Sequence, residues 1–503
     1  MMKRLVVTYL LFLVSCYSIA QISSLGENVQ YAFTVQGTAG VGDNAPFWFT
    51  NNHYGLGTTE NYSGLARIAL WRTVEADSLW FWRMGYGVDL AAPINSENGY
   101  FCVQQAYADI EWKMLRLSLG QKERPSEFKN PYLSTGGMTM GINARPIPQV
   151  RAEMPDFWRV PGTRGIFSFK GHVAYGVYTD DSWQRKFNAG TSNIYTSGSM
   201  FHSKALLLRF GNRKLFPLEV SGGIEMACQF GGRGWNILPY VGETPLQDVD
   251  LGGNIFTALF PGGGDVNDEN YTNAAGNHIG SWHLRFDWIK KDWNVGVYME
   301  HLFEDHSQMF MQYGFWKDIL LGLELKLPKN PFLSSVVYEY IHTMDQSGTI
   351  YHDQTVEIPV QISARDDYYN NHVYGSWQMG GFVLGNPLIL SPVYNPYFNR
   401  PGSLAIQHNR LTVHHVGLAG NPSDEWAWRT LYTHQVSYGS YNMPLLNPQS
   451  SNYLLLEATY SPRWCQGLSF SASYGHNIGD LIGNSHGAML SVRFDGWLNR
   501  TQW

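Results

Sequence analysis

The 503-residue chain is poor in charge and rich in aromatic residues and glycine. Asp, Glu, Lys and Arg make up 15% of the residues, against about 25% in ordinary globular proteins, whereas Phe, Trp and Tyr also reach 15% and glycines number 52. The net charge is −6, and Lys and Arg are scattered rather than clustered, so no nucleic-acid partner is indicated.

Residues 1–20 are typical of a secretory signal peptide, because two basic residues precede an apolar run that ends in small residues. We expect cleavage before Gln21, which leaves residues 21–503 as a single domain. Lipidation at Cys16, within "LVSC", is the alternative. No other segment has 18 or more uninterrupted apolar residues, so a membrane-spanning part would have to be a β-barrel.

Strands with one apolar face are predicted along almost the whole mature chain. Residues 79–90, "LWFWRMGYGVDL", place apolar side chains on alternate positions: Trp80, Trp82, Met84, Tyr86, Val88 and Leu90. Since successive side chains of a strand point to opposite faces, this period of two gives one apolar and one mixed face. The same alternation recurs at residues 28–37, 214–230, 281–289, 467–475 and 487–495.

The predicted strands are joined by connections of two lengths. Short ones lie at residues 75–78, 211–214, 290–292, 328–331, 420–425 and 462–466, and long ones at 179–200, 231–278, 347–408 and 440–450. Outer-membrane barrels alternate short periplasmic turns with longer extracellular loops. A strand through residues 136–150, with Met138, Met140 and Ile142 on one face, brings the count to 18 and gathers the long connections at one end.

Tryptophan placement supports the same topology. Six tryptophans fall at strand ends on the short-turn side: Trp80, Trp112, Trp288, Trp293, Trp426 and Trp497. Amphipathic rings favour the boundary between membrane and water. We therefore predict an all-β transmembrane barrel of about 18 antiparallel strands in the outer membrane of a Gram-negative bacterium, with its apolar face in lipid and its long loops at the cell surface. A soluble sandwich is the alternative.

Five segments resemble the capsule assembly Wzi family and together span nearly the whole mature chain. They are "DNAPFWFTNNHYG" (43–55), "SLGQK" (118–122), "INARPIPQVRAEMPDFW" (142–158), "GNHIGSW" (276–282) and "HVYGSWQMGGFVLGNPL" (372–388). The resemblance implies an eighteen-stranded outer-membrane barrel that binds capsular polysaccharide, and the motifs look like those of a Bacteroides-type member. Enterobacterial members carry a helical segment ahead of the barrel, whereas here only "QISSLGE" precedes the first strand, which puts contacts attributed to that segment in doubt.

The predicted function is that of a lectin-like surface protein that binds capsular or exopolysaccharide and helps its assembly or attachment. The polysaccharide export machinery is a candidate partner. Two alternatives remain open: an outer-membrane porin or substrate channel, and a barrel-borne hydrolase. The sequence carries no nucleophile elbow, zinc signature or phosphate loop, so we expect no enzyme activity, no catalytic residue and no cofactor.

A polysaccharide site needs aromatic faces for sugar C–H surfaces and polar groups for sugar hydroxyls. The predicted loops supply both, and the candidate polysaccharide-binding residues are Trp48, Tyr54, Arg145, His372, Tyr374, Trp377, Asn386 and Tyr394. For each aromatic residue the alternative is packing of the loops into a lid over the pore. For Arg145 the alternative to an acidic sugar is a salt bridge in the lumen.

Inward-facing residues of both charge signs predict a cross-braced lumen: Arg67, Arg83, Arg116, Glu219, Glu225, Arg285, Asp287, Glu324 and Arg493. No metal site is predicted. "GGGDVNDEN" (262–270) lacks the glycine and terminal glutamate of a calcium loop, and His414 and His415 point to opposite faces of a strand. The three cysteines beyond Cys16 form no disulfide framework or CxxC motif.

Overall fold

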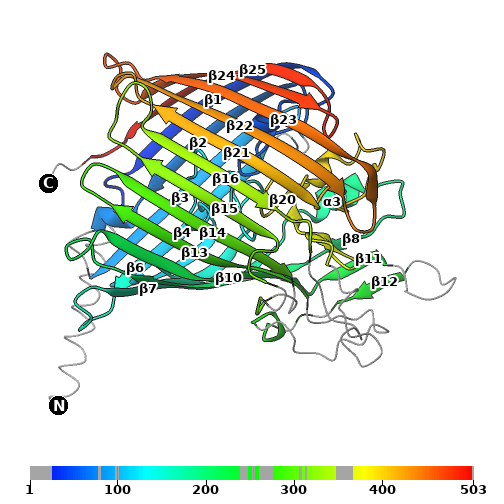
Figure 1. Cartoon of the computed structure of the whole chain (residues 1–503), viewed down its shortest axis with the longest axis horizontal. Coiled ribbons are helices and arrows are strands. Elements are labelled where there is room, and N and C mark those ends of the chain that lie inside the picture. The colour runs from blue at the N-terminus through cyan, green and yellow to red at the C-terminus, as the bar shows by residue number, and fades with distance from the viewer. Residues whose placement is uncertain are drawn as a thin grey trace.

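Eighteen antiparallel strands form one closed barrel, because β1 pairs with β2 on one side and with β25 on the other (Figure 1). This computed structural model describes residues 25–500, with gaps at 78–80, 97–98, 100, 238–246, 252, 254, 260–275, 305–308, 312–313 and 347–365. The predicted fold class and strand count are confirmed. The expected signal peptide lies outside the described residues. No helix among the described residues is long and apolar enough to cross a membrane.

The wall strands follow one another in chain order. They are β1 (Gln30–Gly42), β2 (Tyr62–Arg72), β3 (Trp82–Ile94), β4 (Cys102–Trp112), β5 (Leu115–Gln121), β6 (Gln149–Arg159), β7 (Phe167–Val177), β9 (Met200–Phe210), β10 (Leu218–Phe230), β13 (Asn277–Ile289), β14 (Asn294–Glu304), β15 (Ile319–Lys326), β16 (Ser335–His342), β21 (Leu411–Gly420), β22 (Trp426–Gly439), β23 (Pro444–Tyr460), β24 (Leu468–Gly479) and β25 (Ser485–Trp497).

The remaining elements are short and lie in the connections. They are α2 (Phe47–Thr50), η1 (Val74–Asp77), α3 (Asp181–Phe187), β8 (Tyr195–Ser197), β11 (Arg233–Ile237), β12 (Gln247–Asp250), η2 (Thr257–Leu259), β17 (Asn370–Asn371), β18 (Gly375–Ser376), β19 (Gln378–Met379), β20 (Phe382–Val383) and η3 (Pro392–Tyr394). Figure 1 shows α3, β8, β11 and β12 together at one end of the barrel, which we call the long-loop end.

The alternation read from the sequence sorts side chains between the outside and the lumen. On β3, Val88 is 48% exposed on the outer surface, whereas its neighbour Asp89 is 3% exposed and forms an ion pair in the lumen. Large apolar side chains such as Phe33, Leu206 and Leu490 are likewise exposed on the outer face. The predicted apolar face of residues 79–90 is therefore the outer surface over the described part, residues 82–90, which suits contact with lipid.

The predicted tryptophans do gather at the short-turn end. Trp112 ends β4, Trp426 begins β22 and Trp497 ends β25, while Trp293 lies in the turn that follows Trp288. Trp82 begins β3 and stacks on Trp112, with ring centroids 6.0 Å apart. Trp80 lies outside the described residues.

Two sequence-based boundaries were wrong. Of the strand expected at residues 136–150, only 149–150 lie in a wall strand, because Pro146 and Pro148 have no N–H for a ladder and the N–H of Met138 is donated to Glu300 instead. The strand that completes the count is β6, where Pro155 is accommodated at a register shift between Met154 and Trp158. The long connection expected at 440–450 is only residues 440–443, since β23 begins at Pro444.

The main hydrophobic core lies inside the barrel. Three connections fold into the lumen, residues 43–61, 122–148 and 366–410, and we call them together the plug. Their apolar side chains join lumen-facing wall residues in one buried cluster that includes Phe47, Leu133, Met138, Tyr369, Trp377, Phe382, Leu388, Tyr453 and Leu455. The barrel therefore has an apolar outer surface and a second apolar core in its lumen.

Candidate binding sites in the plugged barrel

The middle connection of the plug crosses the lumen and is held by buried carboxylates. We call its first part, residues 122–135, the strap. Lys129 forms an ion pair with Glu300 of β14 at 3.0 Å, and both side chains are almost fully buried. The Met138 N–H also donates to Glu300, at 2.7 Å, while the Thr135 N–H donates to Glu339 of β16 at 2.6 Å. These charged acceptors fix the segment against the wall.

Further lumenal side chains bind backbone carbonyls and polar groups of the strap. Arg285 donates to the Phe128 carbonyl at 2.8 Å, and Asn130 donates to Glu324 at 3.0 Å. Arg285 also donates to Glu324 at 2.7 Å. Among the described residues, the predicted cross-bracing of the lumen is confirmed and is extended by the strap, which the sequence did not reveal.

The third connection packs onto the middle and first ones through side chains that were predicted to bind sugar. Trp377 donates from Nε1 to the Thr139 carbonyl at 2.9 Å, and Asn386 donates to the Thr135 hydroxyl at 2.9 Å. The Tyr394 hydroxyl accepts a hydrogen bond from the Asn51 amide at 2.9 Å. The polar groups of these residues are thus used inside the plug.

Five of the eight predicted binding residues are buried in this interior: Trp48, Tyr374, Trp377, Asn386 and Tyr394, none more than 3% exposed. Their burial matches the alternative given for the aromatic residues, which is packing of the loops over the pore. A saccharide could touch them only after the plug had opened, since these side chains are already enclosed by protein. A direct binding role for these five stays a prediction that the closed plug does not favour.

The other three predicted residues are accessible. His372 is exposed at the long-loop end. Tyr54 and Arg145 are half-buried and line one cavity of about 80 Å³ between the plug and the wall strands β6 and β7. The structure thus brings together two residues that are 91 positions apart in sequence (145 minus 54).

A pair of aromatic rings at the long-loop end was missed by the sequence reasoning. Tyr195 of β8 pairs directly with Trp235 of β11, and their rings are parallel within 5° with centroids 5.8 Å apart. The Arg233 guanidinium lies 4.6 Å from the Trp235 ring, and Ser197 accepts the indole N–H at 2.8 Å. We call Tyr195, Arg233 and Trp235 the platform. No local sequence signal pairs these residues, because β8 and β11 come from different connections.

The platform lies near one of the predicted residues. Ile237, at the end of β11, packs against Val373 and Tyr374 in a small buried cluster that also contacts Ile194, next to Tyr195. His372 is the exposed neighbour of Val373. The third connection therefore packs against residues next to the platform, and it brings His372 to the same end of the barrel. Aromatic rings beside a guanidinium group match the chemistry expected of a saccharide surface.

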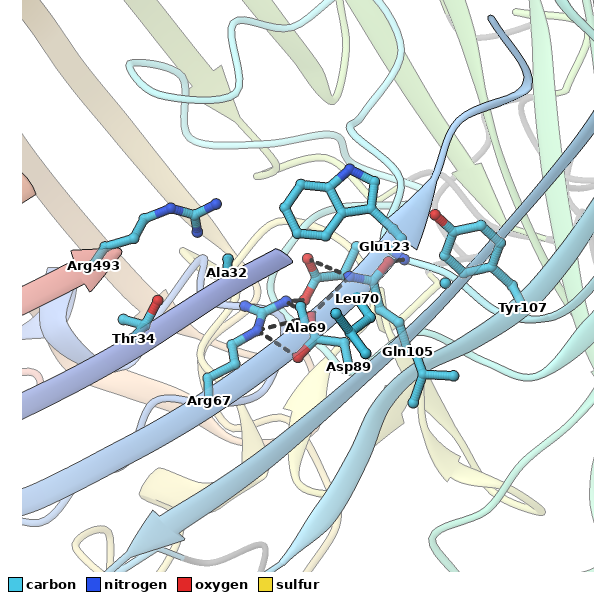
Figure 2. Close-up of a pocket in the computed structure, with 13 residues that line it drawn as sticks. Ala32, Thr34, Arg67, Ala69, Leu70, Asp89, Gln105, Tyr107, Glu123 and Arg493 are labelled. Atoms are coloured by element: carbon cyan, nitrogen blue, oxygen red, sulfur yellow. Dashed lines mark hydrogen bonds and ion pairs between the residues drawn. The ribbon is translucent and has the colours of Figure 1, made fainter. Parts of the chain in front are cut away.

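The lumen also contains a cavity of about 310 Å³ at the level of Arg67 (Figure 2). Arg67 forms ion pairs with Asp89 at 2.5 Å and with Glu123 at 2.8 Å. Figure 2 shows these contacts and shows Arg493 and Tyr107 at the cavity margin. Because the central cation already has two carboxylate neighbours, the cavity presents satisfied ion pairs rather than a free charge.

No clear metal site emerges from the described part of the chain. Asp318, His342 and Asp345 place one ligand atom each within 4.8 Å of one another. Lys317 lies 3.5 Å from Asp345, however, and Asp318 accepts hydrogen bonds from the Tyr368 hydroxyl and the Asp345 N–H. The amine and the hydrogen bonds already satisfy these carboxylates. Residues 262–270 lie outside the described residues.

The adjacent histidines point to opposite faces, as predicted. His415 is buried and contacts the Leu133 carbonyl at 2.8 Å, whereas His414 lies on the outer face, 2.8 Å from the Tyr338 hydroxyl. Cys102, Cys228 and Cys465 form no disulfide among the described residues. The first two are buried on β4 and β10, and the third lies in the turn before β24.

Comparisons with known proteins agree with this architecture. The chain is similar to Wzi of Escherichia coli, described as an outer-membrane protein involved in group 1 capsule assembly and a carbohydrate-binding β-barrel. The TM-score is 0.54 at 13% identity, over 94% of this chain and 86% of that chain. No family model and no curated protein sequence matches. The fold is that of an outer-membrane β-barrel.

Two other solved structures are similar at lower scores. OccK3 of Pseudomonas aeruginosa has a TM-score of 0.46 at 9% identity, over 95% of this chain and 98% of that chain. OccAB2 of Acinetobacter baumannii has a TM-score of 0.46 at 8% identity, over 94% of this chain and 98% of that chain. At these scores neither likeness carries a functional argument, and even the likeness to Wzi speaks for the fold alone.

Proposed function

We propose that this chain is a non-conducting outer-membrane barrel of the Wzi type that binds capsular or exopolysaccharide and holds it at the cell surface. The observation that carries the proposal is the plug. Its three connections fill the lumen and are anchored by the buried carboxylates of Glu300 and Glu339. In the proposed orientation the short turns face the periplasm and the platform faces outward.

The plug argues against the porin alternative. A solute that crossed the lumen would have to displace an apolar cluster and separate the ion pair between Lys129 and Glu300, whose side chains are 2% and 0% exposed. Removing one member of a buried pair from the other costs several kcal/mol, roughly 3–5. The loops are therefore better suited to present a surface than to gate a pore.

The platform supplies the proposed contact surface. The parallel rings of Tyr195 and Trp235 suit the C–H faces of a sugar, and Arg233 suits a hydroxyl or a carboxylate of an acidic polymer. The likeness to a carbohydrate-binding barrel supports this assignment. We further propose retention of polymer without turnover; a polysaccharide-degrading activity lost with a single Ser or Asp substitution would contradict it.

The test is the partition of polysaccharide between washed cells and culture medium. We expect deletion of the gene to leave the total unchanged and to shift polymer into the medium, and we expect Tyr195→Ala with Trp235→Ala to reproduce part of that shift. Trp316→Ala is the matched control, because Trp316 is 62% exposed in the separate connection between β14 and β15. An unchanged partition after deletion would overturn the proposal.

Planar-bilayer recordings separate the proposal from the channel alternative. We expect the purified protein to show no steady conductance of porin size. A steady open channel would favour the porin interpretation, whatever the platform variants do in cells.

A further inference from the structure

Successive residues at the start of the strap point into two different cavities. Glu123 faces the cavity around Arg67, whereas Lys122 and Arg124 line the smaller cavity of about 80 Å³ that also contains Tyr54 and Arg145. We call this second cavity the arginine pocket. The neighbouring Pro125 is exposed, so solvent reaches the margin of the pocket.

The carboxylates that line the arginine pocket are already matched to basic groups. Glu127 forms an ion pair with Lys170 at 2.6 Å, and Glu225 lies 3.6 Å from His283. Two of the lining cations are matched as well: Lys122 pairs with Asp109, and Arg151 pairs with Glu153, each at 2.5 Å. The pocket therefore contains no spare carboxylate among the described residues.

Two arginines remain without a carboxylate within ion-pair distance among the described residues. Within the described segments, Arg124 donates to the Lys122 carbonyl and the Ser118 hydroxyl, at 3.2 and 2.9 Å. Arg145 donates to the Val103 carbonyl at 3.1 Å, and its Nε is buried with no acceptor in the described structure. A buried N–H of a cation without an acceptor is costly unless a ligand or water supplies one.

Arg124 is largely buried, and charged groups of both signs lie around it. Burial, and next the nearby Arg151 guanidinium, lower the pKa of Arg124 to about 10. A bound anion would reverse the electrostatic part of this effect, because an opposite charge favours the charged form of a base.

The backbone is strained where it delivers Tyr54 to the pocket. Tyr54 has φ 51°, a left-handed conformation that a bulky residue adopts rarely. Its N–H donates to the Ile142 carbonyl at 2.8 Å, and the next residue, Gly55, also left-handed, donates to the Asn143 carbonyl at 2.7 Å. A Cβ at Gly55 would lie 2.5 Å from Arg145 Cγ, so the glycine lets the two connections approach. Strained residues of this kind cluster at ligand sites.

We propose that the arginine pocket binds a carboxylate, held between Arg124 and Arg145 with Tyr54 as a neighbour. The guanidinium groups offer forked N–H donors that match carboxylate geometry. The carboxylate could belong to a uronic acid unit of a polysaccharide or to a small organic acid. Only the first source rests on the proposed polysaccharide function; the carboxylate chemistry stands without it.

The test is calorimetric titration of the detergent-purified full-length protein with glucuronate, acetate and glucose. We expect glucuronate and acetate to bind and glucose not to bind. Arg145→Gln should weaken carboxylate binding by about tenfold or more, and so should Arg124→Gln, because each removes a charge-assisted hydrogen bond. Arg185→Gln is the control: it makes the same charge change at an exposed position on α3.

The outcomes separate the two sources and the two proposals. Tighter binding of glucuronate than of acetate assigns the pocket to a sugar acid, and equal affinities assign it to small carboxylates in general. Absence of carboxylate binding, or binding unchanged in both variants, would overturn the proposal. Heat-modifiable migration on gels establishes that each variant is folded. A failure of the polysaccharide partition test leaves carboxylate binding unaffected, so the two proposals fail separately.

Discussion

Removing the two carboxylates that anchor the strap should release the plug without dismantling the wall. Glu300 accepts the Met138 N–H and pairs with Lys129, and Glu339 accepts the Thr135 N–H. Their backbones belong to β14 and β16, whose ladders with neighbouring strands do not use these side chains. Glu339 also accepts a hydrogen bond from the hydroxyl of Tyr298 on β14, at 2.7 Å, so the double variant Glu300→Ala, Glu339→Ala removes one side-chain contact within the wall besides the anchors of the plug.

The expected magnitude follows from burial. Loss of Glu300 leaves Lys129 as an uncompensated charge inside the lumen, which costs about 3–5 kcal/mol. Loss of Glu339 removes a hydrogen bond to a charged acceptor, about 1.5–3 kcal/mol. Together these terms of about 5–8 kcal/mol favour detachment of the strap, because Lys129 regains water when it leaves. At about 1.4 kcal/mol per tenfold, the population of the detached state rises by roughly four to six orders of magnitude.

The assay is single-channel recording in planar bilayers, with gel migration before and after heating as the folding check. We expect the wild-type protein to be silent and the double variant to show frequent open events. Asp495→Ala is the matched control, since Asp495 is a half-exposed carboxylate near the short-turn end that pairs with Arg493 rather than with the plug. A folded double variant that stays silent would refute the anchoring role of the two carboxylates.

Two further predictions test the outer face and the third connection. Gly222→Arg should impair barrel folding by about 2–4 kcal/mol near the bilayer midplane relative to Gly222→Leu. Both variants place a Cβ 2.9 Å from the His283 carbonyl oxygen. The difference in their folding yield into liposomes therefore reports the charged side chain rather than crowding of the backbone. Burial lowers the pKa of His408 to about 4. The folded state therefore favours the neutral imidazole, so folding stability is intact above about pH 6.5 and falls towards pH 4, by up to about 3 kcal/mol. Hydrogen-exchange protection of residues 402–410 should fall at pH 4.5, and it should fall less in His408→Gln.

The wall was predictable because lipid and lumen impose opposite demands on alternate residues. Exposed Val88 and buried, paired Asp89 are adjacent in sequence, and that contrast is visible without a structure. The same logic separated His414 from His415. Local periodicity decides such positions, since each side chain's environment is set by the parity of its own strand.

The middle connection of the plug was not predictable from the same pattern. Met138 and Met140 alternate with polar residues just as a wall strand would, but here the apolar side chains pack into the plug. A plug segment and a wall strand differ in the distant groups that accept their backbone N–H groups. The Met138 N–H donates to the Glu300 carboxylate rather than to a neighbouring strand. Contacts of that kind join residues far apart in sequence, so period alone could not separate plug from wall.

The candidate site shows the same limit. Residue type pointed to Tyr54 and Arg145, which do meet in one pocket, but it pointed equally to Trp377 and Asn386, which hold the plug together. Aromatic and amide side chains serve interior packing and saccharide contact through the same properties. Only burial separates the two uses, and burial in a loop depends on how the whole loop folds.

This division explains why so aromatic a chain can leave few rings for a ligand. The outer surface requires apolar residues to face lipid, and the plug requires a second apolar core because it must exclude water from a lumen lined with charges. Rings such as that of Trp377 are buried in the core of the plug and are not exposed to a ligand. Substitutions there should act on plug stability, whereas substitutions at Tyr195, Trp235 or Arg145 should act on binding with the barrel intact. The ratio of the two effects in each variant thus distinguishes a plug residue from a contact residue.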